Sequence, residues 1–231
     1  MHWLKKYIRH HQLVDWISKN PAAFCACVVI TWTFAGLTGH DPWKPDEAHT
    51  FGITYSVIKD SNWIVPTLAN ELYMKSPALV YIVSAITAMF FEPVFALHDG
   101  ARLSTGFWML IVFGFAALSA RELWGGRSTW LAPTILAGCV GLLVRGHQLT
   151  NSVILLASMS IAIYGLAVAP RRHIVGGLAL GIGGGLSCLA TGLVDLIMII
   201  TITTGMIVIS PIYRTKRFII SLIIALSLAI P

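Results

Sequence analysis

Eight apolar runs of 14 to 20 residues constrain this chain more than any other feature, because each approaches the length of a membrane-spanning helix. Such a helix needs about 20 residues. Only 11% of the 231 residues are charged, against about 25% in a soluble domain. The sequence therefore predicts an all-α, polytopic helical membrane protein and excludes a soluble globular enzyme, a disordered chain and a secreted disulfide scaffold. The runs are 22–39, 78–97, 103–120, 130–146, 152–169, 174–191, 194–211 and 218–231.

The distribution of lysine and arginine indicates which of these runs cross the membrane. Cytoplasmic loops carry an excess of basic residues. If 78–97 does not cross, eleven of the sixteen basic residues lie inside and five outside; if it crosses, the counts become six and ten. We therefore predict about seven spans, the last incomplete, with a cytoplasmic N-terminus and with 78–97 lying in the outer interface.

This topology divides the chain into two parts. Residues 1–21 form a basic cytoplasmic segment with apolar residues at near-helical spacing, as in helices that lie on a membrane surface. Residues 22–231 form one transmembrane domain, in which 40–102 is a long first external loop carrying interfacial helices. Because the last run stops after 14 residues, we expect the chain to be truncated at its C-terminus. The formal charge of +6 fits basic cytoplasmic loops, so no nucleic-acid partner is predicted.

Two features of the external loop suggest chemistry, and each has a structural alternative. Asp46 and Glu47 follow Pro45 at the predicted start of a short helix, where acidic groups complement the helix dipole. A carboxylate there could equally act as a base or bind a cation or a sugar. Lys75 precedes an apolar helix that begins at Pro77. Its ammonium group is placed either to bind a lipid phosphate or to reach the interface as an ordinary anchoring lysine.

Three further basic or aromatic-nitrogen side chains fall near the outer face in this topology. Arg102 is either a second anion contact or the partner of Asp99 or Glu92 in an ion pair. Arg145 and His147 lie at a span end, where they either contact substrate or anchor the helix in the interface.

Six short motifs resemble those of a known family in their order along the chain and in their spacing. The chain resembles the GT-C glycosyltransferases over about residues 20–231, and within them the bacterial lipid A aminoarabinose transferase and protein O-mannosyltransferase-like branch, as the N-terminal portion. That family also has interfacial helices in its first external loop. The motifs are Asp46-Glu47, Trp63-x-Val65-Pro66, Lys75-x-Pro77-x-Leu79-Val80-Tyr81, Ala101-Arg102-Leu103-Ser104, Arg145-Gly146-His147-Gln148-Leu149-Thr150-Asn151 and Gly185-Leu186-x-x-Leu189-Ala190-Thr191-Gly192.

The resemblance implies a membrane glycosyltransferase that moves a sugar from a polyprenyl-phosphate carrier to a lipid A or protein acceptor. The reaction would take place at the periplasmic face of the bacterial inner membrane, with membrane lipids as further partners. No metal site and no certain cofactor are predicted, and a divalent cation is left open. The resemblance assigns Asp46 and Glu47 to catalysis, Lys75 to the carrier phosphate, and Arg102, Arg145, His147 and Asn151 to substrate binding.

Two other classes of function remain as alternatives. The chain could be a transporter or flippase of a lipid-linked substrate, although transporters place ionisable residues near the bilayer midplane, and here they gather toward one face. It could also be a non-catalytic, truncated membrane scaffold. The glycine-rich run 176–185 predicts close helix packing in lipid, and the four cysteines predict small buried residues rather than a disulfide or zinc site.

Overall fold

The computed structural model describes residues 14–69 and 71–229, most of them in helices. The predicted all-α class is confirmed. The first part of the predicted cytoplasmic segment, residues 1–13, lies outside the described residues, and residues 14–19 are helical. The helices are α2 (Pro21–Phe34), α3 (Asp46–Asp60), α4 (Leu79–Phe91), α5 (Leu97–Trp124), α6 (Leu131–Ala137), α7 (Val140–Arg145), α8 (Asn151–Val168), α9 (His173–Thr191), α10 (Leu193–Ile209) and α11 (Lys216–Ala229), with short 3-10 turns at Gly126–Ser128 and Pro211–Tyr213.

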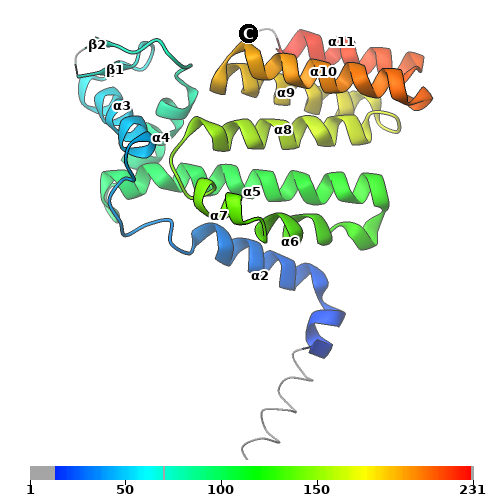
Figure 1. The fold of residues 1–231 in the computed structure, drawn as a ribbon, viewed down its shortest axis with the longest axis horizontal. Coiled ribbons are helices and arrows are strands. Elements are labelled where there is room, and N and C mark those ends of the chain that lie inside the picture. The colour runs from blue at the N-terminus through cyan, green and yellow to red at the C-terminus, as the bar shows by residue number, and fades with distance from the viewer. Residues whose placement is uncertain (1–13, 70, 230–231) are drawn as a thin grey trace, which may run out of the picture.

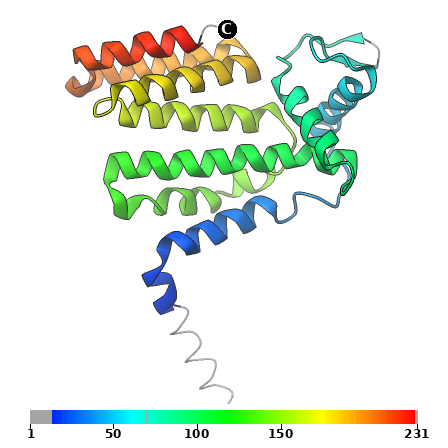
Figure 2. The ribbon, with the colours of Figure 1, turned by 180° about the vertical axis from the view of Figure 1, so that it is seen from behind.

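The longer helices run alongside one another as a bundle, and a smaller group of elements covers one of its ends. Figure 1 shows α2, α5, α8, α9, α10 and α11 side by side, with α6 and α7 beside α5. At one end lie α3, α4 and a small antiparallel hairpin of β1 (Thr67–Leu68) and β2 (Glu71–Leu72). Figure 2 shows the same separation from behind. We call this covered end of the bundle the polar end.

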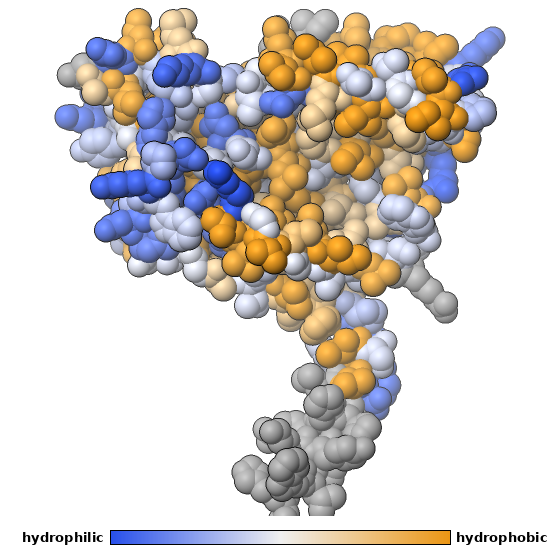
Figure 3. All heavy atoms as spheres, viewed as in Figure 1, coloured by the Kyte–Doolittle hydropathy of each residue, from blue (hydrophilic) through white to orange (hydrophobic). Residues whose placement is uncertain are grey.

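The surface of the molecule follows this division. Hydrophilic side chains gather over the polar end in Figure 3, whereas apolar side chains cover most of the visible bundle. By length and hydropathy, α5, α8 and α9 are the helices in the described part of the chain that could cross a membrane, and α2, α4 and α10 are shorter apolar helices. The seven-span topology therefore stays a prediction.

The helix predicted not to cross the membrane, α4, packs across the first half of α5 at the polar end. The Ser84 and Ser104 hydroxyls are 3.1 Å apart in a hydrogen bond, and Gly100 lies so close to Ala88 that an added Cβ would be 3.0 Å from its Cα atom. The position of 78–97 in the external region stays a prediction.

Several predicted runs differ in their bounds from the helices of the structure; α2, for example, ends at Phe34 rather than at residue 39. The run 130–146 is not one helix: it divides into α6 and α7 where Cys139 adopts an extended conformation after Gly138. The span predicted at 103–120 begins six residues earlier, at Leu97, so Asp99 and Arg102 lie in the first turns of α5 rather than in a loop. The reason is that these charges are buried against the polar end and do not need a solvated loop.

The glycines of α9 pack it closely against two neighbouring helices. An added Cβ at Gly176 would lie 2.5 Å from the Cα atom of Ala169, at the end of α8, and one at Gly183 would lie 2.8 Å from the carbonyl oxygen of Ser158. On another side of α9, a Cβ at Gly177 would lie 2.7 Å from the carbonyl oxygen of Ser221 in α11. The glycine-rich run therefore packs helices closely, as predicted.

Candidate active site

The chain enters α3 from a short segment that follows α2, and the predicted acidic pair lies in the first turn of α3. Successive residues of a helix point about 100° apart, so neighbouring side chains face different surroundings. Glu47 is 1% exposed, whereas the Asp46 side chain is 61% exposed. The two carboxylates are neighbours in the sequence, but that of Glu47 is buried and that of Asp46 is exposed.

The buried carboxylate of Glu47 forms an ion pair with Arg102 of α5. Arg102 Nε donates to Glu47 Oε1 at 2.6 Å, and both side chains are 1% exposed. Arg102 Nη1 donates to Asp99 Oδ1 at 2.9 Å and to the His40 carbonyl oxygen at 2.6 Å. Arg102 thus forms an ion pair with Asp99, as its structural alternative expected, and a second one with Glu47.

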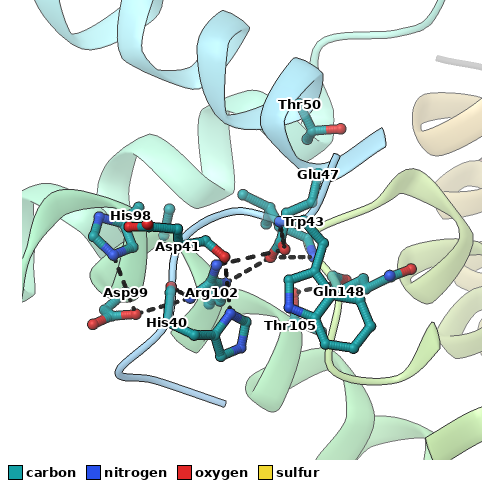
Figure 4. A network of polar contacts seen from close by, with 12 residues as sticks. His40, Asp41, Trp43, Glu47, Thr50, His98, Asp99, Arg102, Thr105 and Gln148 are labelled. Atoms are coloured by element: carbon teal, nitrogen blue, oxygen red, sulfur yellow. Dashed lines mark hydrogen bonds and ion pairs between the residues drawn. The ribbon is translucent and has the colours of Figure 1, made fainter. Parts of the chain in front are cut away.

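Backbone groups complete this arrangement, which Figure 4 shows. The Trp43 N–H donates to Glu47 Oε2 at 2.8 Å, and the Leu149 N–H donates to Glu47 Oε1 at 3.2 Å. The Gly39 N–H donates to Asp99 at 3.1 Å. We call these groups the Glu47 network; it joins the α2–α3 segment, α3, α5 and the α7–α8 segment. Each buried charge has several partners, which is the condition under which a buried ion pair is tolerated.

Asp46 faces an open cavity of about 480 Å³ on the other side of the α3 N-terminus. Its Oδ2 accepts from Arg145 Nη1 at 3.2 Å, and both side chains are about 60% exposed. The cavity is bordered by the end of α7, the start of α8, the segment before α4 and the first turns of α3. Its lining residues are Pro45, Asp46, His49, Thr50, Tyr73, Lys75, Ser76, Tyr81, Arg145, Thr150, Asn151 and Ser152.

A pair of tyrosines and a serine form the wall of this cavity beside Lys75. The hydroxyl groups of Ser76 and Tyr81 are 2.8 Å apart, and the rings of Tyr73 and Tyr81 meet edge to face at 6.0 Å. Burial raises the pKa of Tyr81 to about 12. The phenol therefore stays protonated to a higher pH than an exposed tyrosine and can donate its proton in a hydrogen bond.

The structure brings four of the seven predicted site residues into the cavity. These are Asp46, Lys75, Arg145 and Asn151. Glu47 and Arg102 lie behind it in the Glu47 network, where their geometry fits a positioning role. His147 lies elsewhere: its ring nitrogens are 2.8 Å from the Leu143 carbonyl oxygen and 2.7 Å from that of Trp32, and its ring packs on Trp32 at 4.6 Å.

Eight of the twelve residues that line the cavity were not predicted as site residues, and His49, Tyr73, Ser76 and Thr150 are among them. His49 lies one helical turn after Asp46, so its i+3 spacing could have placed it on the same face of α3. Tyr73 and Ser76 flank Lys75 closely enough to have been included with it. Thr150 carries no signal of its own, because a threonine beside an apolar run is usually a helix cap. No group of three or more histidine, cysteine, aspartate or glutamate side chains arranged to hold a metal ion occurs among the described residues.

An apolar helical bundle with a charged cavity at one end defines the class of membrane-embedded helical proteins. No family model matches the chain. Its fold matches crystal structures of ArnT from Cupriavidus metallidurans, in the apo state and bound to undecaprenyl phosphate. Both have a TM-score of 0.73 and 18% identity, and they cover 93% and 90% of this chain but 41% and 40% of theirs.

Proteins with similar sequences are also named as transferases that use undecaprenyl phosphate. The chain is 26% identical over 185 residues to undecaprenyl phosphate-alpha-4-amino-4-deoxy-L-arabinose arabinosyl transferase 2 of Sodalis glossinidius, covering 78% of this chain and 33% of the relative. It is 32% identical over 87 residues to the corresponding transferase of Serratia proteamaculans, covering 37% of this chain and 16% of the relative. The predicted resemblance to the aminoarabinose transferase branch of the GT-C proteins is confirmed. The chain spans about a third of the length of the first of these relatives.

Proposed function

We propose that this protein is a glycosyltransferase, or the site-bearing part of one, that takes a sugar from a polyprenyl-phosphate carrier. The observation that carries the proposal is the cavity at the polar end, where a carboxylate and two cationic side chains lie together beside an apolar bundle. A polyprenyl-phosphate sugar has the matching chemistry: an anionic phosphate between a polar sugar and a long apolar chain. The names of the similar transferases support the same substrate class.

Each cavity side chain has a role that follows from its charge. Lys75 binds the carrier phosphate through a charge-assisted hydrogen bond. Asp46 acts on the acceptor: with a hydroxyl acceptor it takes the proton as general base, and with a phosphate acceptor it orients the reacting groups or stabilises positive charge on the sugar. Arg145 holds the Asp46 carboxylate in place through their 3.2 Å contact. Asn151 offers amide hydrogen bonds to the sugar or acceptor.

The Glu47 network positions this machinery. Glu47 is adjacent to Asp46, and its hydrogen bond to the Leu149 N–H fixes the segment between Arg145 and Asn151. We therefore assign Glu47 and Arg102 to positioning rather than to contact with substrate. His147 serves to anchor the end of α7 against α2, because both of its ring nitrogens face backbone carbonyl groups.

We infer that the donor is an undecaprenyl-phosphate-linked sugar and that the acceptor is lipid A or a protein. We further infer that the protein lies in the bacterial inner membrane with its N-terminus in the cytoplasm and its cavity in the periplasm. The 22–231 region would then be one GT-C-like transmembrane domain with 40–102 as its main external loop. The orientation is tested with Ser61→Cys and Ser128→Cys in a cysteine-free background. An impermeant thiol reagent added from the periplasm should label position 61 and spare position 128; the reverse pattern would invert the topology.

The activity is tested on the protein purified in detergent with radiolabelled undecaprenyl-phosphate aminoarabinose as donor and lipid A as acceptor. Wild type should bind the donor and transfer the sugar, and Asp46→Asn should bind the donor without transfer. Asp60→Asn, at the other end of α3, is the matched control and should keep full transfer. Donor binding without transfer by wild type would indicate a non-catalytic scaffold. Absence of donor binding would favour the transporter interpretation.

A further inference from the structure

Thr150, the residue before α8, has a buried hydroxyl group without a partner. Thr150 is 8% exposed and borders the cavity. A threonine at this position usually accepts a hydrogen bond from a backbone N–H in the first turn of its helix, but the Thr150 side chain makes no such cap. In the described part of the chain, its Oγ1 is one of four buried side-chain nitrogen or oxygen atoms that lack a hydrogen bond.

The helix that follows Thr150 begins at the cavity wall. The first N–H groups of a helix have no partners within the helix, and the helix dipole places partial positive charge at that end. Asn151 and Ser152, the first residues of α8, both line the cavity. The first turn of this 18-residue helix holds no acidic residue that would cancel its field. The start of α8 therefore presents positive potential and N–H donors to the cavity.

The charges around this point favour an anion over a cation. Lys75 and Arg145 line the same cavity as the start of α8. The carboxylate of the cavity, Asp46, already has Arg145 as its partner at 3.2 Å. A phosphate group entering between them would meet two cationic side chains, the N-terminal end of a helix and a hydroxyl with a free proton.

We propose that Thr150 and the N-terminus of α8 form a binding site for a phosphate group, with the Thr150 Oγ1–H donating to a phosphate oxygen. This rests on the proposed function, because there the phosphate is that of the polyprenyl carrier, which Lys75 of the same cavity also binds. The Thr50 hydroxyl in the same cavity does not compete, because its proton is donated to the Asp46 carbonyl oxygen at 3.0 Å. Among these two threonines, Thr150 is the one with a proton left to donate.

The test removes the hydroxyl while keeping the shape of the side chain. Thr150→Val and Thr150→Ser are compared with wild type for binding of undecaprenyl phosphate and, separately, of inorganic phosphate, using protein in zwitterionic nanodiscs. The matched control is Thr33→Val, which deletes another unpartnered hydroxyl that is buried in α2, outside the cavity. Melting temperatures of both valine variants should equal or exceed that of wild type, since an unpaired buried hydroxyl is costly.

We expect Thr150→Val to weaken undecaprenyl phosphate binding about tenfold or more, the scale of one hydrogen bond to a charged group. Thr150→Ser should bind nearly as wild type does, and Thr33→Val should be unchanged. If wild type binds and Thr150→Val binds equally well, the inference is overturned while the proposed function stands. If wild type binds inorganic phosphate in a Thr150-dependent way but not the lipid-linked phosphate, the anion site stands and the proposed donor is wrong. Binding of neither probe would overturn both.

Discussion

The polar end and the interface between α8, α9 and α11 are held together by opposite means. At the polar end, buried charges and backbone N–H groups from four separate segments meet in the Glu47 network. In the α8–α9–α11 interface, glycines bring helix backbones into close approach. The first depends on a few strong directional contacts, and the second depends on shape.

The difference follows from the surroundings of each region. Apolar helices gain little from burying apolar surface against one another in lipid, so small residues that permit close contact take over. Loops at the end of a bundle have irregular backbones whose N–H and C=O groups need partners. Glu47 and Asp99 supply acceptors for several of these groups at once. Buried charges therefore stabilise the polar end, where the backbone is irregular, and glycines stabilise the interface between regular helices.

The largest loss of stability is expected where a buried charge is left alone. Arg102→Met removes the partner of Glu47 and should cost about 3–5 kcal/mol of unfolding free energy. Adding Glu47→Gln to this variant removes the uncompensated charge and should recover part of that loss. Unfolding by denaturing detergent measures both. A double variant no more stable than Arg102→Met would show that shape, not charge, governs the polar end as well.

A smaller loss is expected in the glycine-packed interface. Gly176→Ala forces the backbones of α8 and α9 apart and should cost about 1–3 kcal/mol, the range for overpacking. Gly114→Ala in α5 is the control, because nothing lies within 4 Å of an added Cβ there; it should be neutral or stabilising, since alanine favours helix over glycine. Equal melting temperatures for the two variants would contradict the close-packing account.

A third prediction concerns binding without a change in stability. Lys75 is exposed and takes no part in the Glu47 network, so Lys75→Ala should melt as wild type does while binding undecaprenyl phosphate about tenfold more weakly. Lys59→Ala, an exposed lysine at the end of α3, serves as the control and should bind normally. Unchanged binding by Lys75→Ala would favour the anchoring role for this lysine.

Only a small effect on stability is expected at the exposed ion pair of the cavity. Arg145→Gln breaks its contact with Asp46, but both side chains are about 60% exposed, so the cost in stability should stay below about 1 kcal/mol. Sugar transfer should fall much more, because the Asp46 carboxylate loses the group that holds it. A parallel loss of stability and transfer would place Arg145 with the structural charges of the Glu47 network instead.

Much of the fold could be predicted from the sequence because hydropathy reports helices in lipid directly. The errors have local physical causes. Gly138 and Cys139 break a helix without interrupting an apolar run, so no hydropathy signal marks the break. Asp99 and Arg102 were predicted to lie in a loop because charged side chains are usually exposed to solvent. In the structure they are buried and bind partners from distant segments.

The candidate site was predictable only in part. Asp46 and Lys75 are in short motifs that resemble those of a known family, and the cavity contains both. The pairing of Glu47 with Arg102 joins residues 55 positions apart, and local spacing does not report such a contact. The unpartnered Thr150 hydroxyl was also beyond prediction, because whether a cap forms depends on the three-dimensional position of its helix.

The adjacency of Asp46 and Glu47 has a consequence for the activation free energy of the proposed reaction. The backbone of Asp46 is held through the bonds that its neighbour makes to the Trp43 and Leu149 N–H groups. The conformational entropy of this turn is therefore lost when the protein folds, not when substrate arrives. A carboxylate held in advance needs little reorganisation in the transition state, and such preorganisation is a large source of catalytic acceleration.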